Sequence, residues 1–361
     1  MIDEVYQKLA EVLNTLPNGF PATDSGVEIK LLKKIFTPGQ AELFCDMRLT
    51  YETADKVAKR TGRPLEGLED KLFSMWERGQ LFSINIGGVR VYKMMPWILG
   101  IYEFQLAHLD EEFAELNEGY FPIFGKQFFE NKPQLMQTIP IEESISISQN
   151  ALTYERISTI IENGQSFMVQ DCICKKEQGI LGKPCEKPLE VCLVIAPIPG
   201  VLDDRPWGRA ISKEEAYDLL RTTEEAGLVH LASNVQKGQY YICNCCGCCC
   251  GILRGINEQG IPASHVINSH YYAEIDPDKC SVCGICADER CQVCAIEEGE
   301  DTYLVIREKC IGCGLCVSTC PEEAIQLIHK KPEELVPPPI TEEQWYEERG
   351  RLRGVDFGAF Q

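Results

Sequence analysis

The sequence has no long apolar run. Its longest apolar stretches, 94–102 and 191–202, are shorter than the roughly 18 residues that suggest a membrane-spanning helix. The first residues, MIDEVYQKLAEV, carry charges where a secretory signal peptide has its apolar segment. We therefore expect a soluble, cytoplasmic protein without membrane insertion.

Motifs for nucleotide cofactors are also missing. The sequence contains neither a dinucleotide-binding GxGxxG pattern nor a phosphate-binding P-loop. Histidine is scarce, and no two of the 5 histidines stand at metal-ligand spacing. A chain that lacks a flavin or nicotinamide site cannot collect hydride electrons by itself, so it needs a redox partner that can.

Positive charge is in short supply. The chain has 35 Lys and Arg against 55 Asp and Glu, which gives a net charge of −20. Such a chain is repelled by polyphosphate, and we do not expect a nucleic-acid partner. Acidity of this kind is common among electron carriers that dock on basic surfaces, although solubility alone explains it equally well.

Cysteine, in contrast, is abundant, with 20 in the chain. A cytosolic protein does not keep so many cysteines as disulfides, and metal ligation is the usual explanation. Cys45 stands alone in an apolar context, and the others fall into four short segments at 172–192, 243–250, 280–294 and 310–320. Disulfide frameworks spread their cysteines along the chain, whereas metal sites bunch them. We therefore expect several metal centres.

Residues 1–96 have the pattern of a helical domain that ends in a hairpin. The predicted helices occupy 3–16, 28–36, 39–48, 51–61 and 64–78. Strands at 81–86 and 89–94 flank Gly87-Gly88, a two-residue turn signal. This order resembles a winged helix-turn-helix domain of transcription regulators. The helix that would enter the DNA groove, 64–78, has more acidic than basic residues, which argues against DNA binding.

The remaining chain divides into three regions. Residues 97–272 predict a mixed α/β, Cys-rich domain with helices at 98–116 and 212–226 and a buried strand at 191–197. Residues 273–331 contain a cysteine repeat. Residues 332–361 are proline-rich and then acidic, which indicates a disordered tail or an extended arm that packs on a partner. The predicted fold class is α+β.

The repeat is the most specific signal in the sequence. The motif CSVCGIC (280–286) recurs as CIGCGLC (310–316), and the second copy closes with Cys320-Pro321. Loops of this spacing point three sulfurs at neighbouring irons of one cubane. Residues 273–331 thus resemble a bacterial-type ferredoxin with two [4Fe–4S] clusters, and a zinc ribbon is the alternative. The resemblance implies one cluster on Cys280, Cys283, Cys286 and Cys320, and a second on Cys310, Cys313, Cys316 and either Cys291 or Cys294.

The fourth ligand of the second cluster is open, because the two repeats differ in length. Aligning Ala295-Ile296 with Ala324-Ile325 places Cys291 opposite Cys320 and Cys294 opposite Glu323. We therefore predict Cys291 as the ligand. Cys294 would be a spare core thiol, or a substitute ligand if the extra residue shifts the loop.

A second constellation is the run CNCCGCCCG at 243–251, which has more thiols than one cubane can bind. In an extended strand, Cys243 and Cys245 would leave from one face, and Cys246, Cys248 and Cys250 from the other. A helix predicted after Gly251 would turn its positive end toward these thiols.

Four more cysteines precede this run and either close a site alone or complete one begun by it. The ten thiols are Cys172, Cys174, Cys185, Cys192, Cys243, Cys245, Cys246, Cys248, Cys249 and Cys250. They predict one or two additional iron–sulfur clusters, with zinc or a metal-free redox thiol site as alternatives. As a whole, the layout resembles 4Fe–4S dicluster ferredoxin-domain proteins of anaerobes, which combine a helical or winged N-terminal region with a CxCCxCCCG element.

Three functions fit these observations. The first is an electron-transfer protein or subunit, which relays single electrons through [4Fe–4S] clusters to or from a partner such as a flavoprotein or another oxidoreductase subunit. The second is a reductase whose catalytic centre lies in 172–250. The third is a redox-sensing transcription regulator with the winged region as its output. The sequence favours the first and identifies no catalytic residue.

Overall fold

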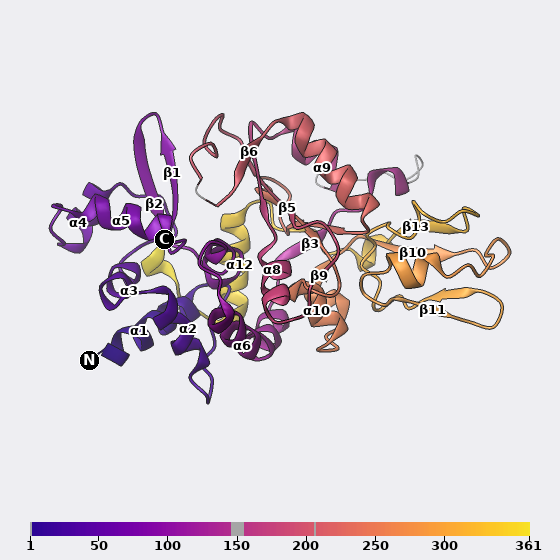
Figure 1. The fold of residues 1–361 in the computed structure, drawn as a ribbon, viewed down its shortest axis with the longest axis horizontal. Helices are drawn as coiled ribbons and strands as arrows, with labels where there is room; N and C mark the ends of the chain where they lie inside the picture. The colour runs from indigo at the N-terminus through magenta and orange to yellow at the C-terminus, as the bar shows by residue number, and fades with distance from the viewer. Residues whose placement is uncertain (1, 146–154, 206) are drawn as a thin grey trace.

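The computed structural model describes residues 2–145, 155–205 and 207–361. The N-terminal helices lie at one end of the long axis, a seven-stranded sheet lies in the middle, and the repeat region (273–331) projects at the other end (Figure 1). Helices and strands both contribute, which confirms the α+β class. None of the helices in the described ranges combines the length and apolar character that a membrane span requires.

The N-terminal region consists of helices followed by a hairpin, in the predicted order. The elements are α1 (Ile2–Thr15), α2 (Val27–Ile35), α3 (Pro38–Cys45), α4 (Ala54–Thr61), α5 (Leu68–Glu77), β1 (Phe82–Ile86) and β2 (Val89–Lys93). Thr37 and Gln40 form a capping box at the start of α3. Gly62 ends α4 in the left-handed conformation, with φ 74°. The helices and the hairpin match the sequence prediction to within a few residues, and the winged-helix assignment stays a prediction.

The helix predicted at 98–116 is wrong. The chain instead makes the short turns η1 (Trp97–Ile101) and η2 (Glu103–Gln105) and then the long helix α6 (Glu111–Glu130). Leu99 inside the first turn has a left-handed φ of 50°. The side chain of Asp110 caps α6 by accepting a 2.9 Å hydrogen bond from the Phe113 amide. Burial of Trp97 and Tyr102 in the core outweighs the local helical periodicity of 98–109.

The middle region is built on the seven-stranded sheet, in the order β6-β4-β5-β8-β7-β3-β9. Its strands are β3 (Met136–Thr138), β4 (Ser166–Asp171), β5 (Glu190–Ala196), β6 (Arg209–Ile211), β7 (Val229–Ser233), β8 (Tyr241–Cys245) and β9 (Ile267–Asn268). All neighbours are antiparallel except β3 and β9. The strand predicted at 191–197 is β5, so this prediction is confirmed.

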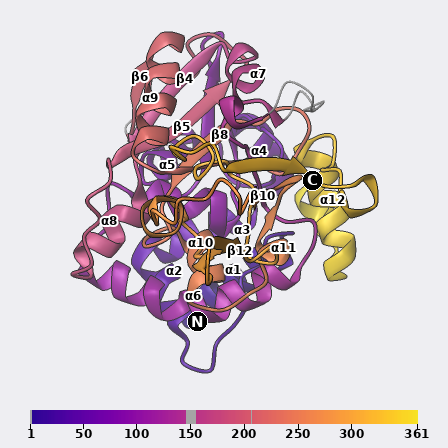
Figure 2. The same ribbon diagram turned by 90° about the vertical axis from the view of Figure 1, so that its right-hand side faces the viewer.

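The two faces of the sheet have different cover. The helices of this region are α7 (Ile157–Glu162), α8 (Ile173–Ile180), α9 (Lys213–Glu225), α10 (Gly251–Asn257) and α11 (Ala263–Val266). Helix α9 begins at the predicted Ser212–Glu215 capping box and, with α7, packs on Phe167, Leu193 and Ile242 (Figures 1 and 2). The opposite face, with Val194 and Tyr241, joins the main core.

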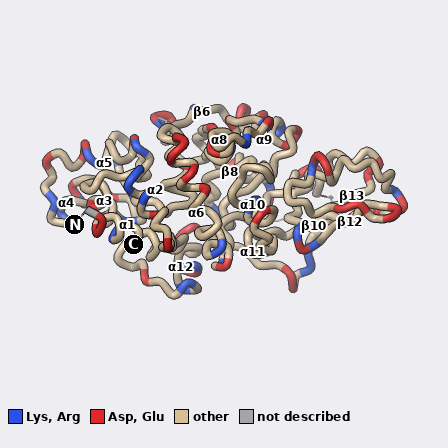
Figure 3. Tube along the Cα trace, turned by 60° about the horizontal axis from the view of Figure 1, so that its bottom comes forward, with Lys and Arg blue, Asp and Glu red and all other residues tan. Residues whose placement is uncertain are grey.

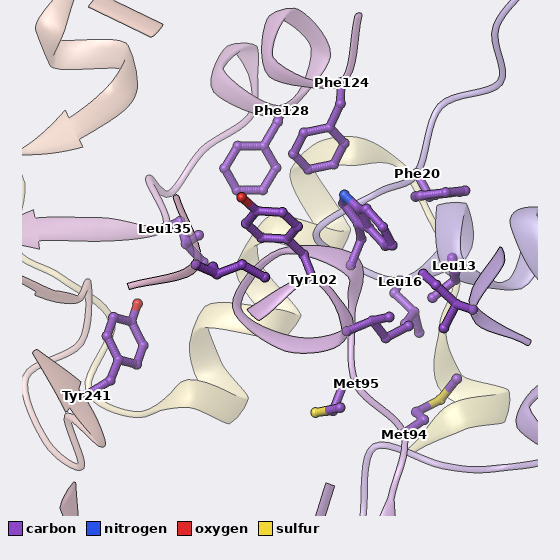
Figure 4. Packing of buried hydrophobic residues seen from close by; sticks show 14 of the residues in the cluster. Leu13, Leu16, Phe20, Met94, Met95, Tyr102, Phe124, Phe128, Leu135 and Tyr241 are labelled. Carbon is purple, nitrogen blue, oxygen red and sulfur yellow. The ribbon is translucent and has the colours of Figure 1, made fainter. Parts of the chain in front are cut away.

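The main core connects the middle region to the N-terminal region. Leu13, Leu16 and Phe20 from the N-terminal region lie in it with Tyr102 and with Phe124 and Phe128 of α6 (Figure 4). Tyr102 and Phe128 are both buried, as are the two leucines. Buried residues of the N-terminal region and of the middle region therefore share one hydrophobic cluster.

The repeat region consists of two short antiparallel pairs. β10 (Tyr271–Ile275) pairs with β13 (Ile325–His329), and β11 (Ile296–Glu298) pairs with β12 (Tyr303–Val305). Each cysteine motif lies in a loop beside these strands, with a left-handed glycine at the same position of both copies, Gly284 (φ 80°) and Gly314 (φ 81°). The internal repeat of the sequence is thus an internal repeat of the backbone.

The sequence suggests a disordered tail or an extended arm on a partner for the C-terminal segment. The structure shows neither of these. The segment contains helix α12 (Glu342–Arg353), which packs on the chain's own core. Trp345 and Arg349 are buried, and Nη1 of Arg349 donates to the carbonyl oxygens of Asn131 and Pro133, both at 2.7 Å. The acidic composition misled the prediction, because the few buried residues determine where this segment lies.

Candidate metal centres

Four thiols of the repeat region gather at its solvent end. We call Cys280, Cys283, Cys286 and Cys320 the outer set. All four line one small cavity of about 20 Å³. Burial raises the pKa of Cys286 to about 11, and the neighbouring thiols of Cys283 and Cys280 contribute to this shift. Cys283 itself is exposed. The set of four thiols provides the donors for one cubane cluster near the protein surface.

A second group lies on the side that faces the middle region. We call Cys291, Cys310, Cys313 and Cys316 the inner set. Burial raises the pKa of Cys313 to about 12, and the nearby thiols of Cys291 and Cys310 contribute to this shift. Backbone amides donate to two of these sulfurs: the Ala273 amide to Cys310 Sγ at 3.4 Å and the Ala295 amide to Cys291 Sγ at 3.1 Å. Such amide–sulfur bonds are a general means of adjusting cluster potential.

The backbone distinguishes Cys291 from Cys294. The Ala295 amide donates to Cys291 Sγ just as the Ala324 amide donates to Cys320 Sγ, at 3.3 Å, in the other repeat. Cys294 is exposed and has a left-handed φ of 48°, and its counterpart Glu323 has a φ of 49°. The structure therefore aligns the residues as the sequence prediction did, which favours Cys291 as the fourth thiol of the inner set.

Six of the ten cysteines of the middle region form a closed ring. We call Cys172, Cys174, Cys192, Cys243, Cys245 and Cys250 the thiol ring. Each of these thiols affects the pKa of its neighbours, in the circular order Cys172, Cys174, Cys250, Cys245, Cys243 and Cys192. Six soft donors exceed the needs of a mononuclear ion and fit a polynuclear iron–sulfur centre.

The sheet brings these ring members together. β5 and β8 are antiparallel neighbours, and Cys192 and Cys243 lie one step beyond the paired residues Leu193 and Ile242. Both thiols therefore leave from the face that also carries Val194 and Tyr241. Asn244 points to the opposite face. Its Oδ1 lies 2.6 Å from His230 Nδ1, and its Nδ2 donates to the Val191 carbonyl at 2.6 Å. These contacts fix the strand between Cys243 and Cys245.

The predicted alternation of the run fails after Cys245, where β8 ends. Cys250 was expected opposite Cys245 but returns to the ring as the N-cap of α10, with its amide bonded to the Cys246 carbonyl at 3.2 Å. Hydrogen bonds from Cys174 and Cys245, and from the amides of Leu253 and Ile252, hold the pKa of Cys250 well below its usual value. The helix start predicted after Gly251 is confirmed.

The other four cysteines form a separate, tighter cluster. We call Cys185, Cys246, Cys248 and Cys249 the tetrathiol group. Their sulfur atoms all lie within 4.8 Å of one another. Cys185 comes from the loop after α8, and the other three come from the turn between β8 and α10. The ten thiols are therefore divided six and four, which the sequence did not predict.

The repeat region contacts the middle region at the turn that carries the tetrathiol group. The Gly247 amide donates to Gln292 Oε1 at 3.0 Å, and Asn257 Nδ2 donates to the Gln292 carbonyl at 2.9 Å. Gln292 directly follows Cys291 of the inner set, and Gly247 lies between Cys246 and Cys248. The Ile141 amide also donates to the Cys313 carbonyl at 3.0 Å. The inner set thus lies against the Cys-rich turn.

A cavity of about 640 Å³ opens onto the thiol ring, and all six ring cysteines line it. Most of its wall is apolar and aromatic, with contributions from Tyr102, from α6 and from Tyr241. Tyr102 donates to Glu177 in a short hydrogen bond, and its hydroxyl lies 4.0 Å from Cys174 Sγ. Asn117 Nδ2 donates to both carboxylate oxygens of Glu177 at 3.0 Å. Burial raises the pKa of Glu177 to about 7.

Sequence reasoning missed these polar neighbours of the ring. Tyr102 lies between two short turns, Asn117 in α6 and Glu177 in α8, and their spacing matches no motif. Gln292 was passed over as a residue between two cysteines. Only the tertiary fold brings these groups to the thiols.

These features define a class: the chain is an iron–sulfur protein with a ferredoxin-type 4Fe–4S binding domain. The family model described as "4Fe-4S binding domain" matches residues 303–326, which include Cys310, Cys313, Cys316 and Cys320. The relative described as "Ferredoxin 7Fe" from Hydrogenibacillus schlegelii is 46% identical over 46 residues, 13% of this chain. The chain covers 59% of that ferredoxin's length. No solved structure matches the chain.

Proposed function

We propose that this chain is an electron-transfer protein or subunit that relays single electrons between a partner redox protein and the thiol ring. The main observation that supports this proposal is the contact of Gln292 with Gly247, which joins the inner set to the Cys-rich turn. The outer set, the inner set and the ring then form a sequence from the surface to the core. Iron–sulfur clusters, when bound, would supply one-electron redox chemistry in these sets.

The donor groups support a separate cluster in each half of the repeat region. Each set contains four thiols, so that two [4Fe–4S] clusters and about eight irons are expected there. The fourth thiol of each set comes from the other cysteine motif, Cys320 for the outer set and Cys291 for the inner set. This interleaving keeps the two sets close and fixes their separation through β10–β13 and β11–β12 pairing.

The outer set supplies the surface on which a partner would dock. Cys283 is exposed, and the adjacent β11–β12 hairpin carries exposed Glu297, Glu298, Glu300 and Asp301 (Figure 3). Tyr303 of this hairpin donates its amide to Cys280, which contributes to a lowered pKa of that thiol. A partner with a basic surface, such as a flavoprotein or another oxidoreductase subunit, would be attracted to this end.

Iron and sulfide analysis of the anaerobically purified full chain, followed by freeze-quench EPR, tests the relay. We expect more than about eight irons per chain, and electrons from a photoreduced flavoprotein should reach the repeat-region signals before the ring signal. Fewer than about four irons in folded protein would contradict the proposal. Simultaneous reduction of all signals would also contradict the order proposed.

A reductase is the second candidate, and the cavity beside the ring favours it. The aromatic wall would accept an apolar substrate, and Tyr102 and Glu177 would hold exchangeable protons near Cys174. Reduction of most organic substrates consumes protons with the electrons, so a buried carboxyl and phenol are suitable neighbours. Cyanide is a direct probe: a shift of the ring EPR signal, with the other signals unchanged, supports an open iron position. An unchanged ring signal rejects this candidate.

A further inference from the structure

The tetrathiol group is more compact than a cluster site. Cys185 Sγ lies 3.8 Å from Cys246 Sγ and 3.7 Å from Cys248 Sγ, and Cys248 Sγ lies 3.6 Å from Cys249 Sγ. Of the described side chains able to ligate a metal, this is the group whose ligand atoms close within 4.8 Å. Neither the outer nor the inner set does so.

These distances decide the nuclearity of the site. Four thiolates at about 2.3 Å from one tetrahedral ion are separated by about 3.8 Å, the edge of the tetrahedron. A cubane puts each thiolate on a different iron, and the intervening irons and sulfides hold the thiolates farther apart. The observed separations of 3.6–3.8 Å therefore fit one ion and not a cluster.

The donor set then selects the ion. Four cysteine ligands leave no open coordination position, which is the pattern of structural zinc. Cys246 and Cys249 are buried, Cys185 is half-buried and Cys248 is exposed, so the site lies near the protein surface with two of its thiols covered. The Cys249 amide bonds to Cys246 Sγ, and Lys175 lies near enough to interact with that thiolate. These contacts offset part of the excess negative charge that four thiolates leave on a divalent ion.

The site joins two segments that are far apart in the sequence. Residues 182–188, which hold Cys185, contain no helix or strand. The turn at 246–249 carries Gly247, and a Cβ at Gly247 would lie 2.1 Å from the Gln292 carbonyl oxygen, so the two backbones touch. An ion that ties the loop to this turn would fix the surface on which the repeat region docks.

We propose that Cys185, Cys246, Cys248 and Cys249 bind one zinc ion, which holds the turn at 246–249 in place beneath Gln292. The ten thiols of the middle region are thus shared between an iron–sulfur centre on the ring and a structural zinc beside it. The zinc site does not depend on the proposed electron relay. Zinc and iron contents report on the two proposals separately.

Metal analysis and zinc-edge X-ray absorption on the anaerobically purified full chain test this proposal. We expect about one zinc per chain, bound by four sulfurs at about 2.3 Å. Cys248→Ala should lose most of the zinc and keep its iron, whereas Cys294→Ala, which changes an exposed thiol outside the group, should keep its zinc.

Several results would overturn the proposal. Wild-type chain with less than about 0.2 zinc, or zinc with nitrogen or oxygen neighbours, contradicts the four-thiolate site. Loss of iron rather than zinc in Cys248→Ala would assign the group to iron. Should that variant fail to fold, the absorption spectrum of the wild type still decides between the two metals.

Discussion

Replacing Gly247 by alanine should weaken the attachment of the repeat region. The new Cβ would lie 2.1 Å from the Gln292 carbonyl oxygen and 2.8 Å from Asn257 Nδ2, whereas ordinary contacts begin at 3.4 Å. The carbonyl must therefore retreat by more than 1 Å, from 2.1 Å to at least 3.4 Å. That shift would break the 3.0 Å and 2.9 Å hydrogen bonds of Gln292.

The expected cost follows from these contacts. Overpacking typically costs about 1–3 kcal/mol, and each lost hydrogen bond adds about 1 kcal/mol. We expect Gly247→Ala to lower the free energy of unfolding by about 3–5 kcal/mol. Gly119→Ala is the matched control, because Gly119 lies in α6 with nothing within 4 Å of its Cβ position. It should stabilise the protein by about 0.5–1 kcal/mol.

Anaerobic urea denaturation measures the stability, and freeze-quench EPR measures how fast electrons reach the ring. Gly247→Ala should slow their arrival at the ring while reduction of the repeat-region signals is unchanged. A variant as stable as the control, with unchanged arrival at the ring, would refute both the close contact and its role as the connection. Metal contents equal to wild type must accompany either result.

Three further predictions concern single side chains. Cys291→Ala should lose about four irons, whereas Cys294→Ala should lose none; the opposite pattern would reverse our alignment of the repeats. Arg349→Met removes donors to several buried carbonyls and should lower the free energy of unfolding, measured by urea denaturation, by about 3–5 kcal/mol. Replacing the exposed Arg351 by methionine should lower it by less than about 0.5 kcal/mol. Glu177 has a folded pKa near 7, above its ordinary 4.5, so its stabilisation is complete below pH 4.5 and is lost as pH rises through 7. Relative to the Glu177→Gln variant, the free energy of unfolding of the wild type should fall by about 2 kcal/mol between about pH 5.5 and 8. Parallel curves of this free energy against pH would contradict the raised pKa.

The repeat region was the most predictable part of the chain, because its chemistry depends on local spacing. Two motifs of the same length place left-handed glycines and cysteines at matching positions, Gly284 with Gly314 among them. The same symmetry separates Cys291 from Cys294, since the extra residue of the first repeat is absorbed before Cys291. Sequence alignment and backbone conformation therefore agree there.

Elsewhere, tertiary contacts determine what local patterns do not. The 98–109 segment has helical periodicity, yet its aromatic residues pack into the core and the helix begins only at the Asp110 cap. Helix α12 has little apolar surface, and its position depends on a few contacts, among them a buried guanidinium that reaches four carbonyls. Neither effect has a signature in a short window of sequence, because the partners lie up to 332 residues away.

The division of the run 243–250 between two centres leads to a sharp prediction for two adjacent residues. Cys245 ends β8 and belongs to the thiol ring, whereas Cys246 begins the turn and belongs to the tetrathiol group. Cys245→Ala should therefore lower iron and leave zinc near wild type, and Cys246→Ala should do the reverse. A single shared centre would instead lose the same metal in both variants. The comparison needs no folded-state assay beyond metal content, since each variant serves as the control for its neighbour.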